Sequence, residues 1–271
     1  MGVSASPPLG RAWRALPRRD LLGVFSAVVG GATLAWVYLF RVADGMADSS
    51  MPMESVRIRP WEAADFFLVM LMWSIMMVGM MVPSALPTIM IYAAVARKAA
   101  RDRTVVPRTL VFVSGYLALW TLFCVVATLA QWGLDQAVLL SPMMVTNSPA
   151  IGSGLLIAAG VYQVTPVKRA CLNHCRSPAH FLSEHWRAGN AGAFRMGMEH
   201  GAFCVGCCWV LMGLLFVGGV MNLLWIAAIA TFVLAEKVIP LPDSPMPARL
   251  TGGAMILAGL ILGVTWAVGG G

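Results

Sequence analysis

Charge is the scarcest property of this sequence. Only 11% of its 271 residues are Asp, Glu, Lys or Arg, whereas 59% are hydrophobic, and soluble globular domains carry about 25% charged residues. Several apolar runs reach the ~20 residues that a transmembrane helix needs. The shortage of charge argues against an ordinary soluble domain. It predicts an all-α, polytopic transmembrane bundle that has the lipid bilayer as a partner.

Familiar catalytic signatures are also missing. The sequence contains no serine hydrolase elbow, no phosphate-binding loop, no dinucleotide fingerprint and no His-Glu-x-x-His motif, which disfavours an enzyme with a familiar soluble mechanism. No internal repeat is evident, and this weakens an inverted-repeat transporter. The net charge of +7 lies at the ends of apolar runs, where it sets topology, so we expect no nucleic-acid partner.

The apolar runs predict about seven membrane spans in one domain, residues 21–271, after a basic tail of residues 1–20. The spans are expected at residues 21–40, 66–96, 105–132, 151–167, 198–220, 223–239 and 250–268. If the N-terminus is cytoplasmic, the inside segments 1–20, 97–108, 168–195 and 237–249 hold 16 of the 19 Lys and Arg residues. This positive-inside bias predicts a cytoplasmic N-terminus and an external C-terminus.

One stretch, residues 171–208, holds five of the six cysteines and all four histidines. Its candidate metal ligands are Cys171, His174, Cys175, His200, Cys204, Cys207 and Cys208. On a helix, His200, Cys204 and Cys207 share one face, and Cys208 points away by about a quarter turn. If the fourth span continues as a helix past the membrane edge, Cys171, His174 and Cys175 share a face as well. Two facing helices can then present several soft ligands to one ion.

The predicted orientation puts residues 168–197 in a cytoplasmic Cys/His loop, where thiols stay reduced. Thiolate and imidazole suit copper(I), zinc and iron–sulfur clusters. We expect the lone Cys124 to pack as a small hydrophobic residue. Glu199 and Glu236 are candidates to orient a ligand histidine, and Lys237 is expected at the membrane interface, beside Glu236.

Methionine is unusually dense in residues 70–90, which contain seven. Met70, Met77 and Met81 fall on one helical face. The predicted external loops add Met46, Met51, Met53, Met143 and Met144. Methionine in membrane helices is ordinarily a packing residue, but its thioether also favours copper(I). The order of external Met, membrane Met and cytoplasmic Cys and His therefore favours copper over the other metals.

Several separated motifs carry a resemblance to a known family. They are MLMWSIMMVGMMVPSALP, CLNHCRSP, HWRAG, MGMEHGAFCVGCCW, LLFVGGVMNLLW and AEKVIP. In this order they resemble a bacterial family of predicted metal-binding integral membrane proteins, a domain of unknown function. The resemblance covers about residues 61–240. It implies metal binding at Cys171, Cys175, His200, Cys204, Cys207 and Cys208, and it favours the bacterial inner membrane.

Three functions compete on this evidence. The leading hypothesis is a membrane protein that transports, delivers or stores a soft metal, with a copper protein or other membrane subunits as further partners. The second is a thiol-redox or iron–sulfur relay protein that uses the Cys204/Cys207 pair. The third is a structural subunit or assembly factor of a larger membrane complex, stapled by a metal. Its small residues would permit close helix packing: Gly30, Gly31, Gly152, Gly154, Gly218 and Gly219.

Overall fold

The computed structural model describes residues 17–48, 61–100, 105–141, 144–239 and 246–269, and within them the chain is helical. Its helices are α2 (Arg18–Asp48), α3 (Ala63–Ala100), α4 (Val105–Gln136), α5 (Pro149–Gln163), α6 (Pro166–Arg176), α7 (Pro178–His185), α8 (Gly189–Gly213), α9 (Leu215–Gly218), α10 (Leu223–Val238) and α11 (Met246–Gly269). No strand occurs in these residues, only one isolated bridge between Leu140 and Thr146. The predicted all-α class is confirmed.

Long apolar helices agree with a membrane protein, but the count of seven spans is not confirmed. Among the described residues, five helices are long and apolar enough to cross a membrane, and the bent pair α5–α6 brings the number to six. Helix α10 has 16 residues and is ~24 Å long, whereas the hydrocarbon core is ~30 Å thick. The prediction of a full span at residues 223–239 therefore stays untested.

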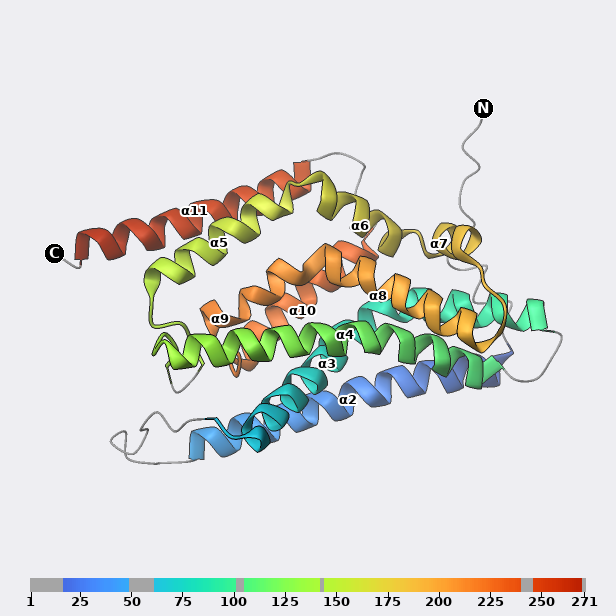
Figure 1. The fold of residues 1–271 in the computed structure, drawn as a ribbon. Coiled ribbons are helices and arrows are strands. Elements are labelled where there is room, and N and C mark those ends of the chain that lie inside the picture. The colour runs from blue at the N-terminus through green and yellow to red at the C-terminus, as the bar shows by residue number, and fades with distance from the viewer. Residues whose placement is uncertain (1–16, 49–60, 101–104, 142–143, 240–245, 270–271) are drawn as a thin grey trace.

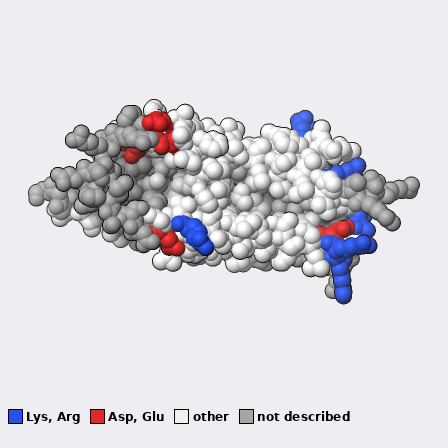
Figure 2. Space-filling model, turned by 90° about the horizontal axis from the view of Figure 1, so that it is seen from below, with Lys and Arg blue, Asp and Glu red and all other residues white. Residues whose placement is uncertain are grey.

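The long helices run back and forth along one axis, so that α2 begins and α11 ends at opposite ends of the molecule (Figure 1). Figure 2 shows Lys and Arg side chains gathered at one end and a broad uncharged band in the middle. Large apolar side chains are also exposed on the long helices, for example Leu34, Leu122 and Leu257, which are 71%, 61% and 59% exposed. An apolar belt of this kind suits lipid, but which end faces the cytoplasm is not determined by it.

Helix α8, which carries most of the cysteines, crosses α4 at very short range. A Cβ atom added to Gly197 would lie 2.0 Å from the carbonyl oxygen of Phe112, and one added to Gly115 would lie 2.1 Å from that of Phe194. Only glycine permits this approach. The predicted close-packing positions Gly30, Gly31 and Gly154 have no neighbour within 4 Å of an added Cβ, so for them the expectation is wrong.

The fourth predicted span is broken rather than continuous. Helix α5 ends at Gln163 and α6 starts at Pro166, with a bend of 65° between them. Thr165 caps α6 by accepting a hydrogen bond from the Lys168 amide, and proline at the first helical position needs no amide partner. The bend turns α6 so that it packs along α8, which a straight extension would not do.

Candidate metal centre

Helix α8 presents its cysteines to the protein interior. Cys204, Cys207 and Cys208 are 1%, 2% and 0% exposed. Cys204 and Cys207 share a face, as predicted from their spacing, and the quarter turn to Cys208 leaves that side chain inside the bundle as well. The Cys208 thiol lies 3.0 Å from the Cys204 carbonyl oxygen and 4.0 Å from the Met81 sulfur of α3. Three thiols and one thioether are thus collected from two helices.

Helix α6 adds a fourth thiol. Buried Cys175 lies near enough to the Cys204 and Cys207 thiols to interact with them electrostatically. Cys171, one turn earlier, lies against α8 so closely that a Cβ atom at Gly206 would be 2.8 Å from its sulfur. All six cysteines are free thiols. We call Cys175, Cys204, Cys207 and Cys208 the thiol cluster.

A buried cation lies within the thiol cluster. The ammonium of Lys237, from α10, is 2.9 Å from the Cys204 sulfur and 3.0 Å from the Ser84 hydroxyl oxygen, and the residue is 8% exposed. The expectation that Lys237 lies at the membrane interface is therefore wrong. A charged residue in an apolar helix is costly and points to function, and this signal was present in the sequence.

Helix α4 contributes a phenol that the sequence gave no reason to select. The Tyr116 hydroxyl donates to the Met81 carbonyl oxygen at 3.1 Å and also lies 3.1 Å from the Cys204 sulfur. Tyr116 is one of several aromatic residues in a long apolar run, and nothing in its spacing marks it. Its role depends on the glycine crossing that brings α4 against α8.

The two candidate ligand histidines have different surroundings. His200 is 2% exposed, stacks between Phe112 and Tyr116, and its Nδ1 atom has no hydrogen-bond partner among the described residues. His174 stacks on Phe203 at 4.0 Å, and its Nδ1 is 2.9 Å from the Ala170 carbonyl oxygen. His200 is therefore left with an unused donor or acceptor, whereas the ring of His174 is engaged by its own helix.

The two carboxylates predicted to orient a ligand histidine have other partners. Glu199 pairs with Arg187 and Arg195, each at 3.2 Å. Glu236 pairs with Lys168 at 2.7 Å and accepts a hydrogen bond from the Gln163 amide. None of these contacts involves His200, so the structure gives no support to that expectation.

Of the predicted methionine path, one member adjoins the thiols. Met81 lies beside Cys208. Met77 is buried in the same helix and Met70 is partly buried, but no sulfur contact brings either to the thiol cluster. Met144 accepts a hydrogen bond from the Gln131 amide at 3.3 Å. The side chains of Met46, Met51, Met53 and Met143 lie outside the described residues.

A second polar group fastens α5, α6 and α10 together, and we call it the lysine–glutamate clasp. It consists of the Lys168–Glu236 ion pair and the side chain of Gln163, which lies between them. Arg176 adds a bond of 2.6 Å from its Nε to the Glu236 carbonyl oxygen. The clasp holds the end of α10, and with it Lys237, against α6. No sequence spacing predicted it.

The donor set fits a soft cation, but its present arrangement does not enclose one. Among the described residues no three His, Cys, Asp or Glu side chains are arranged to hold a metal ion. A cation of the protein itself, the Lys237 ammonium, already contacts Cys204. Two cations at one site repel each other. A metal could therefore join these thiols only if the Lys237 side chain moves aside.

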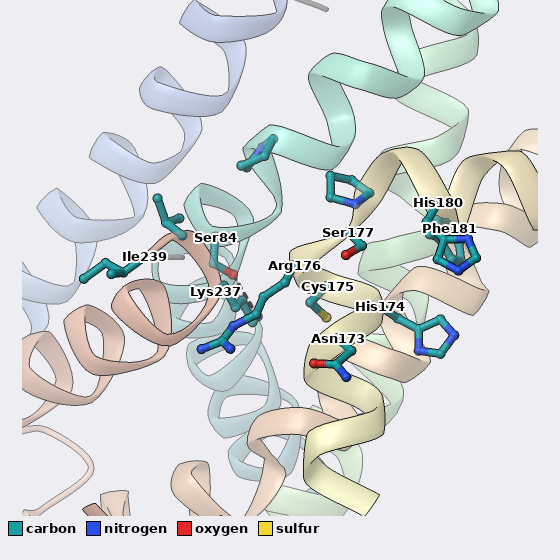
Figure 3. Close-up of a pocket in the computed structure, with 13 residues that line it drawn as sticks. Ser84, Asn173, His174, Cys175, Arg176, Ser177, His180, Phe181, Lys237 and Ile239 are labelled. Atoms are coloured by element: carbon teal, nitrogen blue, oxygen red, sulfur yellow. Dashed lines mark hydrogen bonds between the residues drawn. The ribbon is translucent and has the colours of Figure 1, made fainter. Parts of the chain in front are cut away.

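A pocket of about 590 Å³ leads to this centre between α3, α6, α7 and the end of α10. Figure 3 shows Cys175, Arg176 and Lys237 reaching toward the gap between α6 and α10, whereas His174 projects away from Lys237. Of the four thiols in the cluster, the one that lines the pocket is Cys175.

This architecture is a helical bundle with helices apolar enough for a membrane and with a sulfur-rich centre in its interior, which is compatible with binding a soft metal. A comparison with protein families agrees, because the family model PpoB2, described as copper chaperone, matches residues 70–262. The chain belongs to this family, and the match points to copper binding. A search of curated proteins and of solved structures found no match.

Proposed function

We propose that this protein is a membrane-embedded copper chaperone that holds Cu(I) in the thiol cluster and passes it to a copper protein or membrane subunit. In this proposal it lies in a bacterial inner membrane with its N-terminus in the cytoplasm. The family supports copper, and the apolar helices support the membrane. The site residues, the delivery step and the orientation are our inference.

The observation that carries the proposal is the convergence of four buried thiols and the Met81 thioether from α3, α6 and α8. Thiolates and thioethers prefer Cu(I) over the harder divalent ions. The interior is protected from water and from oxidants, which suits a metal that must stay reduced. His200, with its unpartnered Nδ1, is the candidate nitrogen ligand at the edge of the cluster.

Lys237 has a defined part in this proposal. Several thiolates around one monovalent ion carry excess negative charge, and burying net charge is costly. The ammonium offsets this charge from beside the ion after it has moved off Cys204. Before loading, the same ammonium occupies the place beside the Cys204 sulfur that the copper ion later takes. Lys237 is thus a counter-ion rather than a ligand.

The methionines would form the delivery side. Met81 is the first thioether beyond the thiols, and Met77 and Met70 continue along α3 away from them. Exchange between neighbouring soft ligands costs little when each new bond replaces an equivalent one. We therefore propose that Cu(I) enters or leaves the thiol cluster through Met81.

A copper-loading experiment tests the proposal. Purified wild-type protein, reduced and supplied with Cu(I), should retain stoichiometric copper after gel filtration in elemental analysis, and the double variant Cys204→Ser/Cys207→Ser should lose most of it. Cys124→Ser is the matched control, since Cys124 is equally buried but lies ~12 Å further along α4 than Tyr116. Equal copper in the double variant and the wild type would exclude the thiol cluster.

The proximity of Cys175, Cys204 and Cys207 also leaves the thiol-redox function as an alternative. A second experiment on the same protein distinguishes it from the copper chaperone. A thiol relay would form a disulfide between cluster cysteines during turnover and would trap a partner as a mixed disulfide. Mass spectrometry of alkylated protein isolated from cells detects either species. Copper retention without any such disulfide supports the chaperone, and the reverse result supports the relay.

A further inference from the structure

The pocket beside Cys175 is much larger than a metal ion needs. Its volume of about 590 Å³ lies within the ~300–1,000 Å³ of small-molecule sites. A bare Cu(I) ion would need only a narrow passage. The pocket therefore has room for a ligand of small-molecule size next to the thiol cluster.

The charges on the pocket wall are of one sign. Arg176 and Lys237 line it, and none of the described residues that line it is acidic. Two acidic side chains next to lining residues in the chain have partners: Glu184 faces His180 at 3.6 Å, and Glu236 is held in the lysine–glutamate clasp. A pocket with two cations and polar groups such as Asn173 and Ser177 suits an anion.

One wall of the pocket is a thiol that belongs to the metal centre. Cys175 is 9% exposed, whereas the other three cluster cysteines are 2% exposed or less. A ligand in the pocket can thus reach Cys175 directly, and the remaining thiols through it. This arrangement combines an anion site with the outermost soft ligand of the cluster.

We propose that this pocket receives Cu(I) as a complex with small anionic thiols, thiols that bear carboxylates, and that Cys175 is the residue that takes over the metal. The inference rests on the proposed function and names the donor for the same site. Arg176 binds the carboxylates and is a positioning residue. It orients the complex so that the metal faces the Cys175 sulfur.

The transfer is a ligand exchange without a change of oxidation state. Cu(I) arrives bound to two carrier thiolates. A bond forms between Cu(I) and the Cys175 sulfur while one bond to a carrier sulfur breaks, and the proton of the Cys175 thiol passes to the departing carrier thiolate. Repeating the exchange with Cys204 or Cys207 releases the second carrier and leaves the metal in the cluster.

The test compares Cu(I) donors of different charge. Cu(I) complexes of glutathione, which is anionic, and of 2-mercaptoethanol, which is neutral, are mixed with the full-length protein in detergent, and uptake is followed by rapid quenching and elemental analysis. A local cationic site raises the association rate of an anion by roughly tenfold or more. We expect Arg176→Gln to slow uptake from the glutathione complex about tenfold and to change uptake from the mercaptoethanol complex, which has no carboxylates, less than twofold.

Two further variants keep the result interpretable. Arg169→Gln is the matched control, because Arg169 is exposed on the same helix and does not line the pocket; both donors should react with it as with the wild type. Asn173→Asp adds a negative charge to the exposed pocket wall without touching the clasp, and it should slow only the glutathione donor. This variant carries the test if Arg176→Gln does not fold.

The outcomes separate this inference from the proposed function. If the charge variants slow both donors equally, or neither, while the wild type loads copper, the anionic donor is wrong and the chaperone stands. If the wild type takes up copper from no donor, the proposed function fails and this inference fails with it. An unchanged final copper content in Arg176→Gln shows that the arginine acts on arrival of the metal and not on its retention.

Discussion

The protein buries two lysines on neighbouring helices and gives them opposite surroundings. Lys168 meets the carboxylate of Glu236 at 2.7 Å in the lysine–glutamate clasp, whereas Lys237 meets the sulfur of Cys204 at 2.9 Å and the hydroxyl of Ser84. The Glu236 carboxylate is a hard anionic ligand and forms a structural ion pair with the Lys168 ammonium. A thiol is a soft partner that can exchange a cation for a metal. We therefore interpret the Lys168 pair as a structural contact between helices and the Lys237 contact as part of the proposed metal centre.

Loss of the clasp should have the largest effect on stability. Lys168→Met leaves the Glu236 carboxylate, whose side chain is 14% exposed, without its ammonium, and breaking a fully buried pair in this way costs roughly 3–5 kcal/mol, which is the upper limit for this partly buried one. Denaturant unfolding of the purified protein in detergent measures the change. The double variant Lys168→Met/Glu236→Gln removes both charges and should recover most of the loss. A single variant as stable as the wild type would show that the clasp fastens nothing.

Loss of the other lysine should act on copper instead. Lys237→Met removes the ammonium that, in the proposal, offsets the thiolate charge beside the bound ion. If that charge-assisted interaction with the loaded site is worth about 1.5–3 kcal/mol, copper affinity should fall roughly 10- to 100-fold. Competition with a chromophoric Cu(I) chelator measures it. Lys237→Arg keeps the charge and should retain part of the affinity. If Lys237→Met bound copper as tightly as the wild type, the ammonium would not be a counter-ion, and the two lysines would not differ as described.

The support of the thiol cluster can be tested without touching a polar group. Gly197→Ala inserts a methyl group where α4 and α8 touch, and overpacking of this kind costs about 1–3 kcal/mol. It should also weaken copper binding, because it separates Tyr116 from Cys204. Gly154→Ala is the control, since an added Cβ there meets nothing within 4 Å. Equal unfolding midpoints for the two variants would contradict the close crossing.

The smallest effect is expected at the methionines. Met81→Leu preserves volume and should cost less than about 1.5 kcal/mol of stability, but it removes the thioether beside Cys208 and should weaken copper affinity a few-fold. Met77→Leu, one turn away, should change affinity less, because no contact joins Met77 to the cluster. Identical affinities for the two variants would remove Met81 from the site.

The sequence predicted the helical class and the shared helical face of the candidate ligands on α8 for physical reasons, whereas their role as metal ligands stays a prediction. The length of an apolar run directly predicts a helix long enough to cross a membrane. The i, i+4, i+7 spacing of His200, Cys204 and Cys207 predicts that they share one face of a helix. The proximity of Cys175 to these residues was predicted from two facing helices, although the structure reaches it through a broken helix. These features depend on short stretches of chain.

The features that were missed depend on distant contacts. Lys237 lies 33 residues from Cys204, and Tyr116 lies 88 residues from it. The contact between Tyr116 and Cys204 depends on the crossing of α4 and α8 at Gly115 and Gly197. The sequence alone does not distinguish these glycines from glycines that have no close neighbour. Gly197 and Gly154 look alike in the sequence, and only the packing shows which of them is needed. The clasp was missed for the same reason, since Lys168 and Glu236 are 68 residues apart.

The most direct test of a sulfur-bound copper centre is X-ray absorption at the copper edge of Cu(I)-loaded protein. The thiol cluster predicts a first coordination shell dominated by sulfur, and a marked loss of that signal in Cys204→Ser/Cys207→Ser. A shell made of nitrogen and oxygen alone, or a sulfur shell that the double variant leaves unchanged, would contradict copper binding between α6 and α8.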